Sequence, residues 1–178
     1  FYIDGVDTII TMAIAYGRDL GFSVPLLIGV LLFIQVVAWP CALVYGRLAA
    51  TFSARRLLLV GIGVYCLITL LAFLLPSITD QRLQIGCFWL LAFLVASSMG
   101  GIQALSRSTF GRLIPAEKSG EFFGFYNVAG KFAAITGPFL MGLVGRLSGH
   151  SRWGVLNLLL LFVVGGWLLT RVEPEHPK

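Results

Sequence analysis

Charged side chains are scarce in this sequence, and their scarcity decides its broad class. Only 12% of the 178 residues are Asp, Glu, Lys or Arg, whereas a soluble domain holds about 25%. Hydrophobic residues make up 58% of the chain. A water-soluble core of this length could not bury so much apolar surface, so the sequence predicts an all-α integral membrane protein.

Cysteine and histidine are also rare. Cys41, Cys66 and Cys87 lie in apolar stretches, with neither the spacing of a metal site nor that of a disulfide framework. His150 and His176 lie in a loop and in the tail. The Gly-x-x-x-x-Gly-Lys-Ser/Thr pattern of an ATP-binding loop does not occur. We therefore predict a protein that is not an enzyme and that uses no metal and no cofactor.

Long apolar stretches account for most of the chain. A membrane-spanning helix needs about 20 mostly apolar residues, and six stretches approach this length: 1–17, 25–46, 57–75, 84–106, 122–145 and 153–170. The connectors are short, and the longest is 107–121. The sequence thus predicts one membrane domain over 1–178, a bundle of six transmembrane helices. Because the chain begins with Phe1 inside an apolar stretch, we expect a fragment of a longer protein.

Basic residues predict the orientation of this bundle. Lys and Arg accumulate in cytoplasmic loops, and the alternating connectors divide them unequally. One side receives Arg47, Arg55, Arg56, Arg107, Arg112, Lys118, Arg171 and Lys178, and the other receives Arg18, Arg82, Arg146 and Arg152. The first side, with both termini, is predicted to be cytoplasmic. Basic loops also explain the formal charge of +5 without a nucleic-acid partner.

Polar residues inside the predicted spans indicate a functional path. Asp4, Asp7, Thr8 and Thr11 fall within about a 100° arc of one helix, and Asn127 and Lys131 are four residues apart on the fifth. Charges inside a membrane usually face a cavity or a partner. We expect a solute or proton pathway at these residues. The alternative is an Asp–Lys pair that only locks the bundle together.

A third polar group lies at the inner end of the fourth span. Gln103 and Arg107 are four residues apart, so both can face the inner mouth of a cavity. The alternative for Arg107 is that its side chain extends along the helix to reach lipid phosphates.

The connector between the second and third spans carries a family motif. It runs from Gly46 to the pair Arg55 and Arg56. The segment resembles the loop motif of the major facilitator superfamily, which has a glycine, then an acidic residue, then a second glycine and a basic pair. Ala50 replaces the acidic residue and Ser53 stands near the second glycine. A degenerate copy is typical of the C-terminal half of such transporters.

Three further segments resemble one family within that superfamily, the vacuole effluxer-like permeases. They are 2–8, 100–115 and 121–138, and together they extend the resemblance over nearly the whole chain. The resemblance implies the C-terminal half of a twelve-helix transporter, built from two three-helix inverted repeats that work by alternating access. It also implies a cavity lined by the first and fourth helices and outer surfaces formed by the third and sixth.

These observations together predict a secondary active transporter half that moves a small solute. Amino acids, as the solute, follow from family analogy alone, and coupling to protons is a hypothesis based on Asp4 and Asp7. The expected partners are the solute, the lipid bilayer and the missing N-terminal half, in a bacterial inner membrane. A non-transporting scaffold or a channel-forming bundle remains the alternative function. A phosphatidyltransferase is disfavoured because the second aspartate pair of its pattern is absent.

Overall fold

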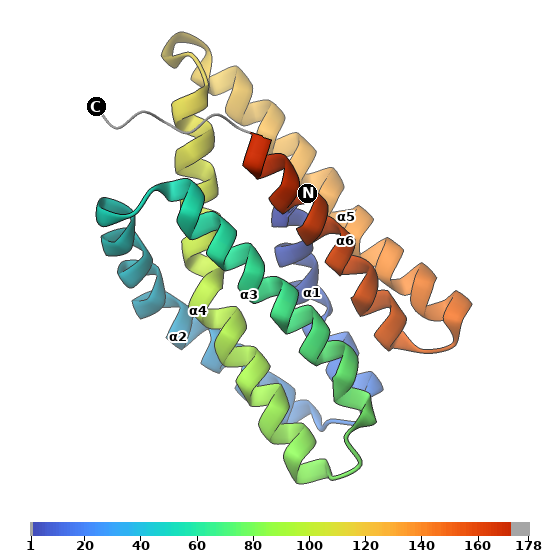
Figure 1. Ribbon diagram of the computed structural model, residues 1–178. Coiled ribbons are helices and arrows are strands. Elements are labelled where there is room, and N and C mark those ends of the chain that lie inside the picture. Colours follow the sequence, from blue (N-terminus) through green and yellow to red (C-terminus); the bar gives the residue numbers. More distant parts are fainter. Residues whose placement is uncertain (1, 172–178) are drawn as a thin grey trace.

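The computed structural model describes residues 2–171, except for the side chains of Ala116, Ala129 and Ala133, and this part of the chain is helical (Figure 1). The predicted all-α class is confirmed. Six α-helices follow one another in this part of the chain: α1 (Tyr2–Asp19), α2 (Val24–Thr51), α3 (Ala54–Leu74), α4 (Gln81–Leu113), α5 (Ser119–Ser148) and α6 (Ser151–Arg171). The short 3₁₀ turns η1 (Leu75–Ser77) and η2 (Ala116–Lys118) lie before α4 and α5.

The helices extend beyond the predicted apolar stretches, and two predicted connectors are therefore wrong. Between α2 and α3 only Phe52 and Ser53 are non-helical, so Gly46 lies within α2 and Arg55 and Arg56 lie in the first turn of α3. The predicted connector 107–121 shrinks in the same way, because α4 continues to Leu113. Backbone hydrogen bonding does not stop where the hydrocarbon ends, and Arg, Leu and Ala continue a helix readily.

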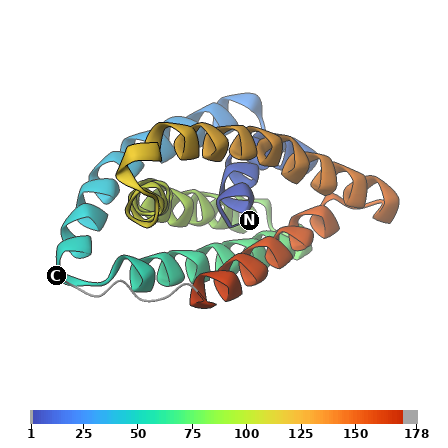
Figure 2. The same ribbon diagram turned by 90° about the horizontal axis from the view of Figure 1, so that it is seen from above.

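Five of the six helices are long and apolar enough to cross a membrane, and α1 is not among them. Its 18 residues include four charged side chains: Asp4, Asp7, Arg18 and Asp19. In the structure α1 contacts α2, α4, α5 and α6, and Figure 2 shows it between α5 and the pair α3 and α6. A helix surrounded by other helices can carry charges that a lipid-facing helix cannot.

The helix contacts follow the pattern of two interlocked three-helix units. α1 packs against α5 and α6, the last two helices of the second unit. α4 packs in the same way against α2 and α3, the last two helices of the first unit. α3 and α6 also contact each other. The first helix of each unit therefore packs against the last two helices of the other.

Small residues allow α2 and α4 to approach closely. A Cβ atom added at Gly100 would lie 2.8 Å from the Cβ of Ala42, and one added at Gly101 would overlap the ring of Tyr45. Close backbone approach through small residues is how helices associate in lipid, where the hydrophobic effect does not drive their association.

We expect Gly101→Ala to destabilise the protein. Its methyl group would overlap the Tyr45 ring, and overpacking of this kind costs about 1–3 kcal/mol in unfolding free energy. The matched control is Gly63→Ala in α3, where an added Cβ meets no atom within 4 Å. Thermal unfolding of the purified protein in detergent micelles measures both changes. Equal midpoints for the two variants would show that the α2–α4 contact is looser than described.

Candidate functional site

A polar cleft with a volume of about 810 Å³ opens between α1, α4 and α5. It lies at the end of the bundle where α1 begins, α4 ends and α5 begins. The structure brings six of the predicted site residues together in its walls: Asp4, Asp7, Gln103, Arg107, Asn127 and Lys131. These residues come from three helices that are far apart in the sequence, so the cleft is a product of the tertiary fold.

Two hydrogen bonds join α1 to α4 along one wall of the cleft. The side-chain amide Nε2 of Gln103 donates to Oδ1 of Asp7 at 3.1 Å. The hydroxyls of Tyr2 and Ser106 are hydrogen-bonded to each other at 2.7 Å. The Asp7 carboxylate is therefore held in a fixed orientation by a residue 96 positions away in the sequence.

The carboxylate of Asp4 has different surroundings. Its Oδ1 atom is buried and has no hydrogen-bond partner among the described residues. It lies against α5 at Gly137, where an added Cβ would stand 3.3 Å from Oδ1 of Asp4 and would overlap the hydroxyl of Thr8. A buried acceptor without a donor is energetically costly. Among the described residues, Asp4 is therefore the carboxylate of the cleft that has an oxygen without a donor, and this oxygen can accept a proton.

The positive charges of the cleft belong to α4 and α5. Arg107 and Lys131 both line it, and both side chains are exposed. Within residues 2–171, no ion pair joins Lys131 to Asp4 or Asp7. The described residues therefore do not form the Asp–Lys ion pair of the alternative hypothesis. The cleft instead presents carboxylates on α1 and cationic groups on the two facing helices.

Two predicted residues, Thr8 and Thr11, do not line the cleft. The hydroxyl of Thr8 donates to the carbonyl of Asp4 at 2.7 Å, and that of Thr11 donates to the carbonyl of Asp7 at 2.8 Å. Threonine in a helix commonly bonds its own backbone four residues earlier. Thr8 is fully buried where α1 packs against Gly137 of α5, and Thr11 lies one turn beyond Asp7, the last residue of α1 in the cleft wall.

Aromatic residues near the end of the cleft were missed by the sequence prediction. Tyr2, Phe110 and Tyr126 line it, and the Phe110 ring lies 4.8 Å from that of Tyr126 and 5.5 Å from that of Phe123. Aromatic residues make up 13% of this chain, so an aromatic residue in an apolar stretch does not by itself indicate a binding site. Ser106 and Thr109 also line the cleft, and the Thr109 hydroxyl is buried without a partner in the described part of the chain.

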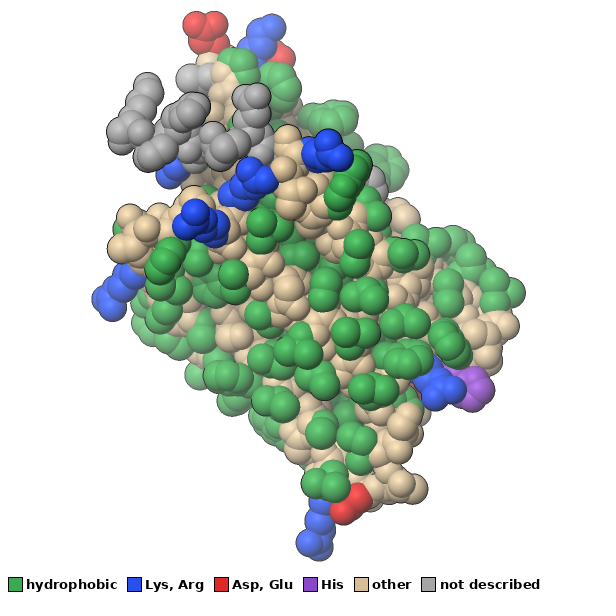
Figure 3. Space-filling model, viewed as in Figure 1, with side chains coloured by type: hydrophobic (Ala, Val, Ile, Leu, Met, Phe, Trp, Pro, Cys, Tyr) green, Lys and Arg blue, Asp and Glu red, His purple; other side chains and the backbone are tan. Residues whose placement is uncertain are grey.

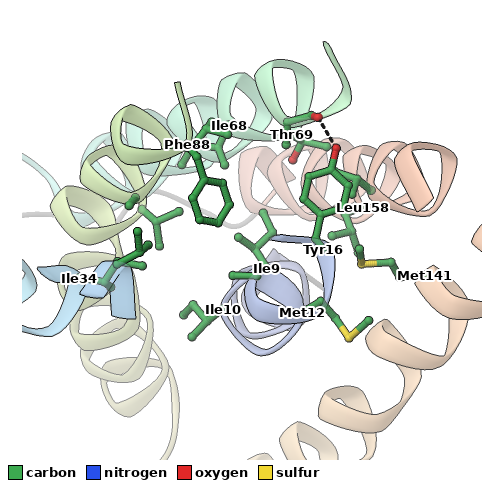
Figure 4. Close-up of a pocket in the computed structure, with 17 residues that line it drawn as sticks. Ile9, Ile10, Met12, Tyr16, Ile34, Ile68, Thr69, Phe88, Met141 and Leu158 are labelled. Atoms are coloured by element: carbon green, nitrogen blue, oxygen red, sulfur yellow. Dashed lines mark hydrogen bonds between the residues drawn. The ribbon is translucent and has the colours of Figure 1, made fainter. Parts of the chain in front are cut away.

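Beyond the cleft, the interior of the bundle is mostly apolar, with a few buried polar side chains such as Thr69 and Ser98. A cavity of about 70 Å³ lies among all six helices, with Ile9, Ile34, Phe88 and Leu158 in its walls (Figure 4). The hydroxyl of Tyr16, which points into this region, donates to the carbonyl of Ala72 at 2.6 Å. The first half of α1 therefore lines a polar cleft, and the second half lies in an apolar layer that closes it.

Comparison with known proteins identifies the family. The family described as "Vacuole effluxer Atg22 like" matches residues 1–178 of this chain. The chain belongs to this Atg22-like family. The sequence-based resemblance is thereby confirmed.

The relatives of this Atg22-like chain include bacterial and fungal proteins. The "Uncharacterized MFS-type transporter YxiO" of Bacillus subtilis is 47% identical over 175 residues, which cover 98% of this chain and 39% of that protein. The "Autophagy-related protein 22" of Cryptococcus neoformans is 30% identical over 190 residues, covering 100% of this chain and 34% of the relative. The protein of the same name from Saccharomyces cerevisiae (strain ATCC 204508 / S288c) is 34% identical over 76 residues, or 43% of this chain and 14% of that protein. No solved structure matches this chain.

Membership of the Atg22-like family establishes the broad class. The chain belongs to a family of multi-pass integral membrane proteins of the MFS transporter type, and the family is one of transporters rather than enzymes. It spans 39% and 34% of the lengths of the two relatives that match it along nearly its whole length.

Proposed function

We propose that this chain is the C-terminal half of a twelve-helix secondary active transporter that moves amino acids by alternating access. The observation that carries this proposal is the division of charge within one cleft. Asp4 and Asp7 lie on α1, while Arg107 and Lys131 lie on α4 and α5. A zwitterion carries both an ammonium and a carboxylate group, so it can satisfy both walls at once.

The size and the polarity of the cleft support a small solute. Its volume of about 810 Å³ falls within the range of about 300–1,000 Å³ typical of small-molecule sites. Gln103 and Asn127 add amide groups that can both donate and accept hydrogen bonds. The aromatic rings of Phe110 and Tyr126 offer apolar contact to a side chain. These groups match the parts of an amino acid better than those of a sugar or a metal ion.

We further propose that proton binding at Asp4 couples transport to a pH gradient in a bacterial cell membrane, with the C-terminus in the cytoplasm. The unpartnered Oδ1 of Asp4 supports the proton site. The excess of Lys and Arg at the end of the bundle where α2, α4 and α6 terminate supports the orientation. The cleft lies at that same end of the bundle, so under this proposal its opening faces the cytoplasm.

The test is solute counterflow into proteoliposomes that contain the full-length transporter. A radiolabelled panel would contain amino acids, sugars, and carboxylates that lack an amino group. We expect saturable exchange of amino acids only, and none with the isolated 178-residue chain, because half of the path would be absent. Single-channel conductance in a planar bilayer would favour the channel alternative. The absence of exchange for every panel member would contradict the transport proposal.

A further inference from the structure

We propose that the edge formed by the start of α3 and the end of α6 binds the headgroup of an anionic phospholipid. The residues of this basic edge are Arg55, Arg56 and Arg171. They lie outside the cleft, and neither the family nor the transport proposal assigns them this role. This surface suits a phospholipid because its basic edge can bind the phosphate and the apolar helix faces below it can contact the acyl chains.

A hydrogen bond fixes the geometry of the basic edge. Nη2 of Arg55 donates to the carbonyl oxygen of Thr170 at 2.5 Å, across 115 positions of sequence. This bond places the first turn of α3 directly beside the last turn of α6, which ends at Arg171. The guanidinium of Arg171 lies over the ring of Trp167 at 5.0 Å. Arg55 also neutralises part of the negative end of the α6 dipole, so the two helix ends are held together.

The α2–α3 side of this edge has no acidic residue to neutralise its arginines, whereas Glu173 and Glu175 follow Arg171 in the sequence, outside the described residues. The sequence contains no Asp or Glu between Asp19 and Asp80, a segment that includes α2 and α3. Ala50 stands where the superfamily motif has its acidic residue. Arg56 is exposed to solvent. Its planar guanidinium suits bidentate binding of phosphate oxygens, which makes a phosphodiester a better ligand than a neutral headgroup.

Below the basic edge, the face that α3 and α6 form is apolar. Val60 of α3 is 61% exposed, and Val163 and Trp167 of α6 are 56% and 55% exposed. Figure 3 shows hydrophobic side chains over this face and Lys and Arg side chains along its upper edge. An acyl chain can lie along the apolar field while its phosphate reaches the arginines. A soluble anion would use only the upper part of this surface, so we assign it to a phospholipid.

The test measures which lipids remain bound to the full-length transporter in native mass spectrometry. Phosphatidylglycerol and phosphatidylcholine would be offered in equal amounts, and inorganic phosphate in a separate arm. The test variant is Arg56→Gln with Arg171→Gln. Its matched control is Arg82→Gln with Arg146→Gln, which removes two exposed arginines from the opposite end of the bundle. The single variants Arg56→Gln and Arg171→Gln serve if the double variant does not purify.

We expect the wild type and the control to prefer phosphatidylglycerol, and the test variant to lose that preference. Each basic residue near an anionic lipid surface contributes roughly fivefold in binding, so the double change should reduce the preference by more than tenfold. Equal loss in both double variants would overturn the proposal, because it would indicate general charge attraction. A wild-type protein that bound both lipids equally would also overturn the proposal. So would binding of inorganic phosphate as strong as the binding of phosphatidylglycerol.

Discussion

Replacing Lys131 with alanine in the full-length transporter should raise the KM for amino-acid exchange about ten- to hundredfold. Lys131 lines the cleft, is exposed, and is joined to neither aspartate by an ion pair within the described residues. Its ammonium group is therefore available to a solute carboxylate. A hydrogen bond to a charged group contributes about 1.5–3 kcal/mol, which corresponds to that range of affinity. The measurement is the concentration dependence of counterflow in proteoliposomes.

Two further variants separate this role from a structural one. Lys131→Arg keeps the positive charge and should retain most of the affinity. Arg146→Ala removes an exposed cation from the last turn of the same helix, outside the cleft, and should leave KM unchanged. If Lys131→Ala lowered only the amount of folded protein and left KM at the wild-type value, Lys131 would have no part in solute binding.

Much of the site could be predicted from the sequence because charges in an apolar chain are conspicuous. Asp4, Asp7 and Lys131 stand out in stretches that are otherwise hydrophobic, and desolvation makes such residues gather around water-filled space. The helical repeat then assigns neighbours: Gln103 and Arg107 share a face, as do Asn127 and Lys131. All six of these residues line the cleft. Thr8 and Thr11, which were also predicted to lie on the path, do not line it.

The remainder of the site depends on contacts that periodicity does not encode. The part of α1 that lines the cleft is set by where α4 and α5 pack against this helix. The hydrogen-bond partner of Asp7 is Gln103, 96 residues away in the sequence. The sequence does not indicate that Asp4 and Thr8 lie against Gly137, as they do in the structure. Helix ends were also misplaced, because hydropathy reports where the membrane ends and not where backbone hydrogen bonds end.

The two aspartates of α1 therefore differ in a way that the sequence alone does not show. Asp7 accepts a hydrogen bond from Gln103, whereas Oδ1 of Asp4 is buried without a partner within the described residues. The other charged or titratable groups that line the cleft are Tyr2, Arg107, Tyr126 and Lys131. A carboxylate with a bound donor favours its ionised form, and one with a desolvated oxygen and no donor favours protonation. Under the proton-coupling proposal, this contrast favours Asp4 as the proton carrier and Asp7 as the carboxylate that contacts the solute.

Asp4→Asn should consequently abolish accumulation driven by a pH gradient while leaving solute counterflow intact. Asparagine resembles the protonated carboxyl in shape and charge but cannot release a proton, so the transporter would exchange solute without coupling. Asp7→Asn should behave in the opposite way. Its amide oxygen can still accept the Gln103 bond, but the lost charge should raise KM for the solute about tenfold or more while accumulation still responds to pH. Both activities are measured in the same proteoliposomes. Accumulation that stays pH-driven in Asp4→Asn and disappears in Asp7→Asn would reverse the assignment, because the proton site would then be the hydrogen-bonded carboxylate.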